Sequence, residues 1–281
     1  MATGVVMIDN GELTAILRAA ARAEILPRFR NLGAGDIATK SDPHDLVTEA
    51  DTAAEVRITE ALRARLPQAL IVGEEAVSAN ASLLDGLGTA ELSAIIDPVD
   101  GTWNFARGLA LFGMILALGA RGRVTHGILY DPLLDDRVEA REDGPCEMVT
   151  ADGNRRRLAT SPIADPALMT VYLPLALVPR ERRPALAATF AEFGRVGGLR
   201  CSCHEYRLIA QGHAEAALAA VLNPWDHAAG ALAVTRAGGV ARMLDGDDYH
   251  LGLARDAGYL LTASSEAAWE AMAVRLRPAL L

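Results

Sequence analysis

Hydrophobic residues recur with helical spacing near the start of the chain. The spacing predicts a helix over residues 12–29, followed by a second helix over residues 48–67. The second helix begins on a capping threonine, has acids in its first turn and ends at a proline. The polar stretch between the two, residues 38–45, contains a proline and predicts a loop. The apolar face of the first helix consists of Leu13, Ile16, Leu17, Ala20 and Ala21.

Short apolar runs bounded by turn formers indicate buried strands over residues 69–73 and 93–97. Residues 111–139 predict a three-stranded meander, after which strands and helices alternate. The alternating part has expected strands near 169–173, 214–222 and 259–262, and expected helices near 182–193, 204–211, 225–237 and 266–276. Such a pattern favours a layered enzyme of the α+β or α/β class. We expect one compact unit with an N-terminal α+β half, residues 1–145, and a C-terminal α/β half, residues 146–281.

Composition narrows the class of protein. Hydrophobic residues make up 51% of the 281 residues and charged residues 22%, which is typical of a globular protein with a sizeable core. The net charge of −9 argues against a nucleic-acid partner, since such a surface needs a basic face. Three cysteines without a CxxC pair indicate a reduced, cytoplasmic protein. We expect neither a secretory signal nor a membrane span.

Acidic residues gather where predicted elements end or begin. A single aspartate at such a position is more often a helix cap or a turn residue. The set is harder to explain in that way, because like charges at the ends of two apolar runs repel unless a cation neutralises them. Oxygen ligands without a matching set of histidines or cysteines suit Mg²⁺ or Mn²⁺ rather than zinc. The acids concerned are Asp45, Glu74, Glu75, Asp97, Asp100 and Asp226.

Gly101 and Thr102 directly follow two of these acids. A glycine lets the backbone approach a ligand closely, and a turn into a helix directs free N–H groups outward. A phosphate bound there would also meet the cations, and the hydroxyl of Thr102 could hold a water. The pattern therefore favours metal-assisted hydrolysis of a phosphate ester.

Four segments resemble the signatures of the inositol monophosphatase family, in the order and at separations similar to those of the family. They are DLVTEAD at residues 45–51, GEE at 73–75, DPVDGTWNF at 97–105 and PWDHAAGALAVTRAGG at 224–239. The resemblance implies a layered αβαβα sugar-phosphatase fold. It also implies a homodimeric, Mg²⁺-dependent phosphatase that acts on small phosphomonoesters.

The resemblance assigns a role to each matching residue. Glu74, Asp97 and the carbonyl of Val99 would hold one metal ion, and Asp97 would bridge to a second. Asp100 and Asp226 would complete the second site, and a third, weaker ion is implied near Glu74. Most of these carboxylates thus fall in the N-terminal half, while the C-terminal half contributes Asp226.

Other roles concern water, phosphate and support. The resemblance implies that Asp45 and Thr102 orient and deprotonate the attacking water, and that the N–H groups of Gly101 and Thr102 hold phosphate oxygens. Glu74 is the third residue that we expect to take part in catalysis. The supporting residues around them would be Lys40, Thr48, Asp51 and Glu75.

Departures from the family pattern concern the substrate. Ala219 stands seven positions before Asp226, where inositol phosphatases keep an acid that binds ring hydroxyls, and its absence weakens an inositol assignment. We expect Arg200 and Ser202 to contact the substrate. His204 and Arg207 could do so too, although surface or interface packing explains the stretch about as well. Trp103 either shapes the edge of the pocket or simply packs.

Several functions stay open at this point. Within the enzyme class, the ester could be histidinol phosphate, a sugar bisphosphate or a 3′,5′-bisphosphate nucleotide. Outside it, a regulatory relative associated with RNA or transcription could keep the fold without turnover. The complete set of expected metal ligands favours the enzyme.

Overall fold

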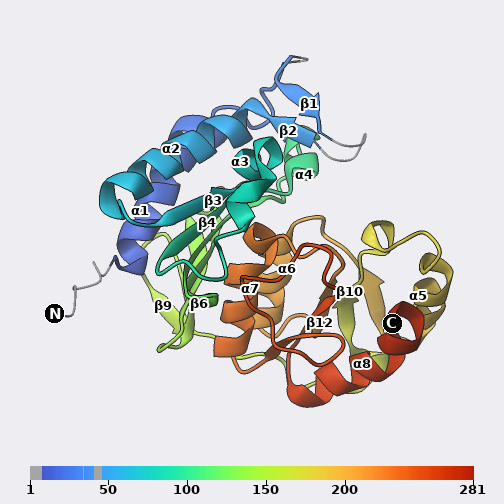
Figure 1. Cartoon of the computed structure of the whole chain (residues 1–281). Helices are drawn as coiled ribbons and strands as arrows, with labels where there is room; N and C mark the ends of the chain where they lie inside the picture. The colour runs from blue at the N-terminus through green and yellow to red at the C-terminus, as the bar shows by residue number, and fades with distance from the viewer. Residues whose placement is uncertain (1–7, 34, 41–45) are drawn as a thin grey trace.

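The computed structural model describes residues 8–33, 35–40 and 46–281. Its helices and strands form five layers, which confirms the layered α/β fold expected from the sequence (Figure 1). Helices α1 and α2 cover one face of a first sheet, and α6 and α7 lie between this sheet and a second one. Helices α5 and α8 cover the outer face of the second sheet. None of the helices in the described ranges is long and apolar enough to cross a membrane.

The outer helices have well-defined starts. α1 (Asn10–Ala20) begins at Asp9, whose carboxylate accepts the N–H of Glu12, and continues into a π-helical turn, Ala21–Ile25. α2 (Glu49–Arg65) begins with a capping box in which Thr48 and Asp51 satisfy each other's backbone groups. The second helix lies where the sequence predicts it, whereas the first begins two residues earlier and ends, with its π-helical turn, four residues earlier than predicted. Their apolar faces pack on the first sheet.

The first sheet has seven strands in the order β3-β4-β5-β6-β7-β8-β9. β3 and β4 pair in parallel, and the other neighbours are antiparallel, so the predicted meander is confirmed. The sheet extends to Arg157, whereas the division of the chain at residue 145 stays a prediction. The strands are β3 (Leu70–Gly73), β4 (Ser93–Asp100), β5 (Gly113–Ala120), β6 (Arg123–Asp131), β7 (Asp136–Arg141), β8 (Cys146–Val149) and β9 (Arg155–Arg157).

In the middle helix layer, α7 carries most of the small residues. α6 (Ser202–Ala210) and α7 (Pro224–Arg236) pack against each other and between the two sheets. A β-carbon on Gly230 would lie 2.2 Å from the ring of Tyr206, so only glycine allows this helix contact. Close packing at this layer fixes the start of α7 relative to the first sheet.

The second sheet has five strands in the order β11-β10-β12-β14-β13. Its strands are β10 (Thr170–Tyr172), β11 (Arg195–Gly197), β12 (Ala216–Ala219), β13 (Val240–Met243) and β14 (Leu260–Ala263). Its outer face packs on α8 (Glu266–Leu280), beside α5 (Arg183–Thr189), and Trp269 of α8 is fully buried there. The predicted strands and helices of this half are present, although most are a few residues longer or shorter than expected.

Two short helices follow strands of the first sheet: α3 (Glu74–Ala79) after β3, and α4 (Thr102–Ala106) after β4. The predicted loop over residues 38–45 is wrong for Ala38 and Thr39. They belong to β1 (Ile37–Thr39), which pairs with β2 (Leu46–Thr48). Backbone pairing outweighs the polar composition there.

Candidate metal and phosphate site

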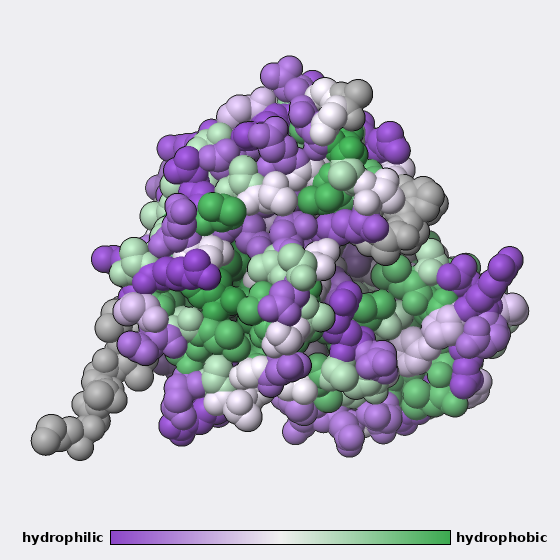
Figure 2. Space-filling view, turned by 45° about the horizontal axis from the view of Figure 1, so that its top comes forward, coloured by the Kyte–Doolittle hydropathy of each residue, from purple (hydrophilic) through white to green (hydrophobic). Residues whose placement is uncertain are grey.

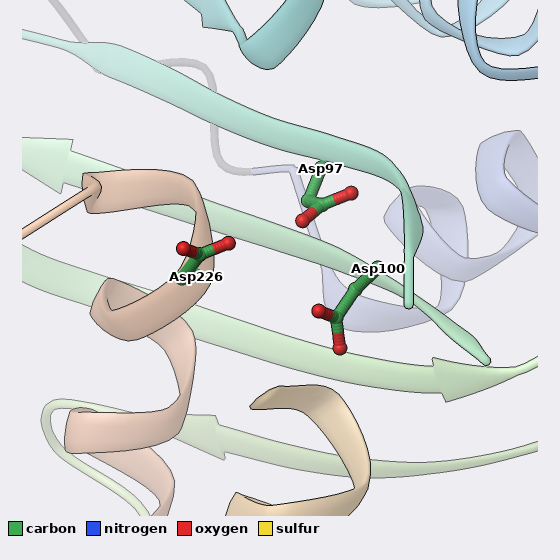
Figure 3. Close-up of side chains that lie close together, drawn as sticks. All are labelled: Asp97, Asp100 and Asp226. Atoms are coloured by element: carbon green, nitrogen blue, oxygen red, sulfur yellow. The ribbon is translucent and has the colours of Figure 1, made fainter. Parts of the chain in front are cut away.

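Three carboxylates from distant parts of the chain point toward one another. Asp97 and Asp100 come from β4 and Asp226 from α7, and each offers an oxygen within 4.8 Å of the other two (Figure 3). The two aspartates of β4 are buried, and Asp226 is partly exposed. This arrangement brings together three of the acids singled out in the sequence.

A β-bulge explains why two residues three apart share one site. In a regular strand, Asp97 and Asp100 would point to opposite faces, because side chains alternate. The pairing of β4 with β5 shifts register between these two residues, where Pro98 has no N–H to donate. The N–H of Val99 instead donates to the carboxylate of Asp97 over 3.1 Å. The bulge thus turns both carboxylates to the same side.

The first turn of α6 holds Asp100. The carboxylate of Asp100 accepts the N–H of Ser202 over 3.1 Å and that of Cys203 over 2.5 Å. The thiol of Cys201 donates to the same carboxylate, with 3.0 Å between sulfur and oxygen. These three donors fix the side chain and leave part of the carboxylate to face Asp97 and Asp226.

The N-terminus of α7 holds Asp226. The side-chain amide of Asn223, at the cap position of this helix, donates to the Asp226 carboxylate over 3.0 Å. Pro224 supplies the first helical residue without an unpaired N–H. His227, next in the chain, uses one ring nitrogen on the Tyr206 hydroxyl and the other on the Val221 carbonyl, so it is not placed as a ligand.

Electrostatics shows that the carboxylates need a counter-charge. Burial raises the pKa of Asp97 well above its ordinary value, and the nearby Glu74 and Asp100 raise it further. Burial and Asp226 raise the pKa of Asp100 to about 6, although its hydrogen bonds oppose the shift. Buried acids that repel one another in this way, with oxygens converging on one point, fit a hard divalent cation.

Glu74 and Glu75 begin α3 beside this group. The ammonium of Lys40 lies 2.8 Å from a carboxylate oxygen of Glu74 and 2.7 Å from one of Glu75. Burial raises the pKa of Glu74 to about 8, with Asp226 adding to the shift and Lys40 opposing it. Glu74 therefore senses the charge of Asp226 and belongs to the same electrostatic group as the three aspartates.

The turn after β4 has the geometry expected for a phosphate cradle. Gly101 has a φ of +91°, and a β-carbon there would lie 3.2 Å from the carbonyl oxygen of Leu111. Thr102 begins α4, so its N–H has no acceptor within the helix. Its hydroxyl lies 2.9 Å from a carboxylate oxygen of Asp51 and 3.0 Å from the carbonyl of Val99. Asp51 also accepts the N–H of Thr48, which ties the cap of α2 to this turn.

Sequence reasoning missed two supports of the site. Glu55 accepts the N–H groups of Glu75 and Ala76 at the start of α3. The sequence contained a signal for this role, because Glu55 lies four residues after Asp51 and therefore on the same face of the helix. Nothing in the sequence signalled that the Cys201 thiol would donate to Asp100.

The remaining predicted residues lie in different settings. Asp45 falls outside the described residues. Ser202 touches Asp100 through its backbone N–H, and the guanidinium of Arg200 lies over the ring of Trp103. Ala219 is buried in an apolar cluster with Leu222, Met243 and Leu260.

Of the two interpretations left open for Arg207, the structure favours packing over substrate contact. Arg207 is buried and donates to the carbonyl of Leu129 over 2.8 Å and to the carboxylate of Asp136 over 2.5 Å. His204 is also occupied, with Nε2 lying 3.0 Å from the carbonyl of Phe112. Both side chains fix α6 to the first sheet, so packing explains them.

Known proteins resemble the chain over most of its length. Nus factor SuhB of Pseudomonas aeruginosa is 31% identical, covering 81% of this chain and 83% of that protein. Nus factor SuhB of Escherichia coli K12 is 29% identical, covering 72% and 73%. Extragenic suppressor protein suhB from Bartonella henselae shares the fold, with a TM-score of 0.74, 22% identity and 96% of each chain covered. Inositol monophosphatase-II from Staphylococcus aureus does so with a TM-score of 0.77, 20% identity and coverages of 95% and 93%. A model of the inositol monophosphatase family matches residues 9–278, so the chain belongs to this family.

Proposed function

We propose that the protein is a Mg²⁺-dependent phosphomonoesterase that hydrolyses a small phosphorylated metabolite. The observation that carries the proposal is the convergence of Asp97, Asp100 and Asp226 beside the turn at Gly101 and Thr102. A homodimer is part of the proposal and rests on the family resemblance, whereas a cytoplasmic location rests on the use of cysteine. Mn²⁺ could replace Mg²⁺ because both prefer oxygen ligands.

The chain's own residues divide the work. Asp97, Asp100, Asp226, Glu74 and the carbonyl of Val99 would hold two or three Mg²⁺ ions. When bound, these ions lower the pKa of water and neutralise phosphate charge.

The turn after β4 then positions the reacting groups. The hydroxyl of Thr102, held between Asp51 and Val99, orients the attacking water. The resemblance assigns removal of the proton from this water to Thr102 and Asp45, and Glu74 takes part through the metal ion that it would hold. The left-handed backbone at Gly101 lets a phosphate oxygen approach the N–H groups of Gly101 and Thr102. By resemblance, Asp45 would assist Thr102.

The residue at position 219 argues against inositol as the alcohol group of the substrate. Ala219 offers no acceptor for ring hydroxyls, and its neighbours Leu222, Met243 and Leu260 are apolar. The candidate substrates therefore include histidinol phosphate, sugar bisphosphates and 3′,5′-bisphosphate nucleotides.

The decisive test is Asp97→Asn, assayed on a panel of phosphorylated metabolites with Mg²⁺. Loss of a carboxylate that would hold metal should lower kcat/KM by about 100-fold or more, since even supporting residues around a metal typically cost 10- to 100-fold. Asp143→Asn is the control, because Asp143 is exposed and pairs only with Arg141 among the described residues. Hydrolysis that survives Asp97→Asn, or that is indifferent to a chelator, would contradict the proposal.

A second candidate function is a transcription-related role. The relatives of P. aeruginosa and E. coli carry the name Nus factor, which favours it. Such a role would appear as a stoichiometric macromolecular partner in a pull-down, together with negligible turnover across the ester panel. The same pull-down with Asp97→Asn would show whether binding and hydrolysis are separable.

A further inference from the structure

An aromatic ring with two guanidinium groups lies next to the proposed phosphate turn. The guanidinium carbon of Arg200 is 4.2 Å from the centre of the Trp103 ring, and that of Arg107 is 5.9 Å from it. Trp103 directly follows Thr102 and is partly exposed, while both arginines are exposed. We call Trp103, Arg107 and Arg200 the arginine rim.

The arginine rim is fixed relative to the metal site. The side-chain amide of Asn104 donates to the carbonyl of Leu199 over 2.9 Å, which ties α4 to the segment that carries Arg200. Two residues after Arg200, the N–H of Ser202 donates to Asp100. A group bound at the rim would therefore lie at a defined place beside a phosphate at Gly101 and Thr102.

Arg200 has a costly backbone conformation. Its φ is +54°, in the left-handed region where a residue with a β-carbon is strained and glycine is not. Residues that are held in this region destabilise the fold and are concentrated at functional sites. Keeping an arginine where glycine would fit better suggests that the side chain has a function.

Positive charge continues beyond Trp103. Arg107 and Arg30 line a pocket of about 380 Å³ with Gly108, at the end of α4. Within residues 8–33, 35–40 and 46–281, no carboxylate forms an ion pair with Arg30 or Arg107. In a chain with a net charge of −9, such a group of cations favours a bound anion. Figure 2 shows hydrophilic residues spread over much of the face turned to the viewer.

The geometry points to a substrate with a second anionic group, a phosphate or a carboxylate, that Arg200 binds with help from Arg107. Guanidinium groups bind both anions through paired N–H donors, and the ring of Trp103 holds the planar cation in place. The apolar surroundings of Ala219 agree, because nothing there selects for ring hydroxyls. Arg200 is then the residue that determines specificity. This inference rests on the proposed phosphatase activity.

Two matched substrate pairs test the inference with the Mg²⁺-loaded full chain. Fructose 1,6-bisphosphate differs from fructose 1-phosphate by a second phosphate, and 2-phosphoglycerate differs from glycerol 2-phosphate by a carboxylate. We expect at least one pair to show about a tenfold preference in kcat/KM for the member with the second anion. The pair that shows it identifies the anion.

Arg200→Gly removes the side chain and relaxes the left-handed backbone, so the variant should fold with a melting temperature close to that of the parent. The preference should fall about tenfold, mainly through a higher KM for the member with the second anion. Arg107→Gln should lower the preference for the second anion by a smaller factor. The control is Arg123→Gln, which removes the same charge at an exposed site paired with Glu142.

The outcomes separate the two proposals. If the protein hydrolyses the simpler esters without preferring the second anion, this inference is wrong and the phosphatase proposal stands. It is also wrong if Arg200→Gly keeps the preference, if Arg200→Gly only lowers the melting temperature, or if Arg123→Gln lowers the preference equally. Absence of hydrolysis both for these four esters and for the whole panel of phosphorylated metabolites would overturn both proposals.

Discussion

Glu205 is a single residue whose protonation the fold controls. It lies in α6, and its carboxylate accepts the N–H of Leu199 over 2.6 Å, which holds the segment before Cys201. Burial raises the pKa of Glu205 to about 7 although the hydrogen bond to Leu199 opposes it, and the charges of Asp100 and Asp226 add to the rise. The folded protein therefore keeps a proton on this group at pH values where the unfolded chain releases it.

We predict that Glu205→Gln removes a pH-dependent loss of stability. Because the pKa of Glu205 rises from an ordinary 4.5 to about 7 on folding, its contribution is fully present below pH 4.5 and is lost as the pH rises through 7. The variant should match the parent near pH 4.5 and exceed its free energy of unfolding at pH 8 by on the order of 1–3 kcal/mol. Urea denaturation at both pH values measures this.

The exposed Glu270 of α8 provides the matched control. Glu270→Gln should leave the pH profile of the parent unchanged. If both variants respond alike, or if Glu205→Gln is less stable at pH 8, the burial argument for Glu205 fails.

At the scale of elements, α3 depends on a side chain from another helix. This six-residue helix has no side-chain cap of its own at Gly73. Glu55 of α2 supplies the acceptors instead, each oxygen 2.8 Å from the N–H of Glu75 or Ala76. A β-carbon on Gly73 would lie 2.2 Å from the carboxyl carbon of Glu55, so glycine leaves the space that this side chain needs.

We predict that Glu55→Ala lowers both stability and metal affinity. It leaves two N–H groups at the start of α3 without their acceptor, which should cost about 1–3 kcal/mol in the free energy of unfolding. Glu74 begins the same helix, so its displacement should raise the Mg²⁺ concentration for half-maximal phosphatase activity about tenfold. Urea denaturation and a Mg²⁺ titration measure the two effects.

Glu55→Gln keeps one acceptor oxygen and should lie between Glu55→Ala and the parent in both measurements. A stability loss with no change in the Mg²⁺ titration would show that α3 does not position Glu74.

How well an element can be predicted depends on what determines it. α2 and α7 were predictable because caps, periodicity and stop signals lie within their own sequence. Other elements depend on residues that are distant in the sequence. Glu55 of α2 stabilises the short helix α3, and β8 and β9 form strands because they pair with each other. The aspartates of the site were predictable from their places at element ends. The bulge in β4 and the Cys201 contact to Asp100 arise from tertiary packing, which a single sequence does not display.

At the scale of the whole molecule, the site joins two layers. Asp97 and Asp100 belong to the first sheet and Asp226 to the middle helix layer, so a cation among them would connect layers that the fold brings together (Figure 3). The unfolded chain has no such cluster. A ligand that binds only the folded state stabilises it, by about 2.7 kcal/mol at a concentration one hundred times its Kd.

We predict that Mg²⁺ raises the melting temperature, and raises it more at pH 8 than at pH 5. Burial raises the pKa of Glu74 to about 8 and that of Asp100 to about 6, and raises that of Asp97 as well. Without metal, the folded state thus holds protons that the unfolded chain has released, and stability falls as the pH rises from about 4 to 8. Mg²⁺ replaces those protons, so its effect is greatest where they are lost.

Asp97→Asn separates this explanation from unspecific salt effects. The substitution removes the most buried of the three charges, so the metal-free variant should melt above the metal-free parent at pH 8, while Mg²⁺ adds little to it. Melting curves with chelator and with Mg²⁺, at pH 5 and pH 8, give all the comparisons. An equal Mg²⁺ effect in parent and variant would place the cation elsewhere. A metal-free variant less stable than the parent at pH 8 would mean that Asp97 supports the fold through its hydrogen bond to Val99 more than it strains the fold through repulsion.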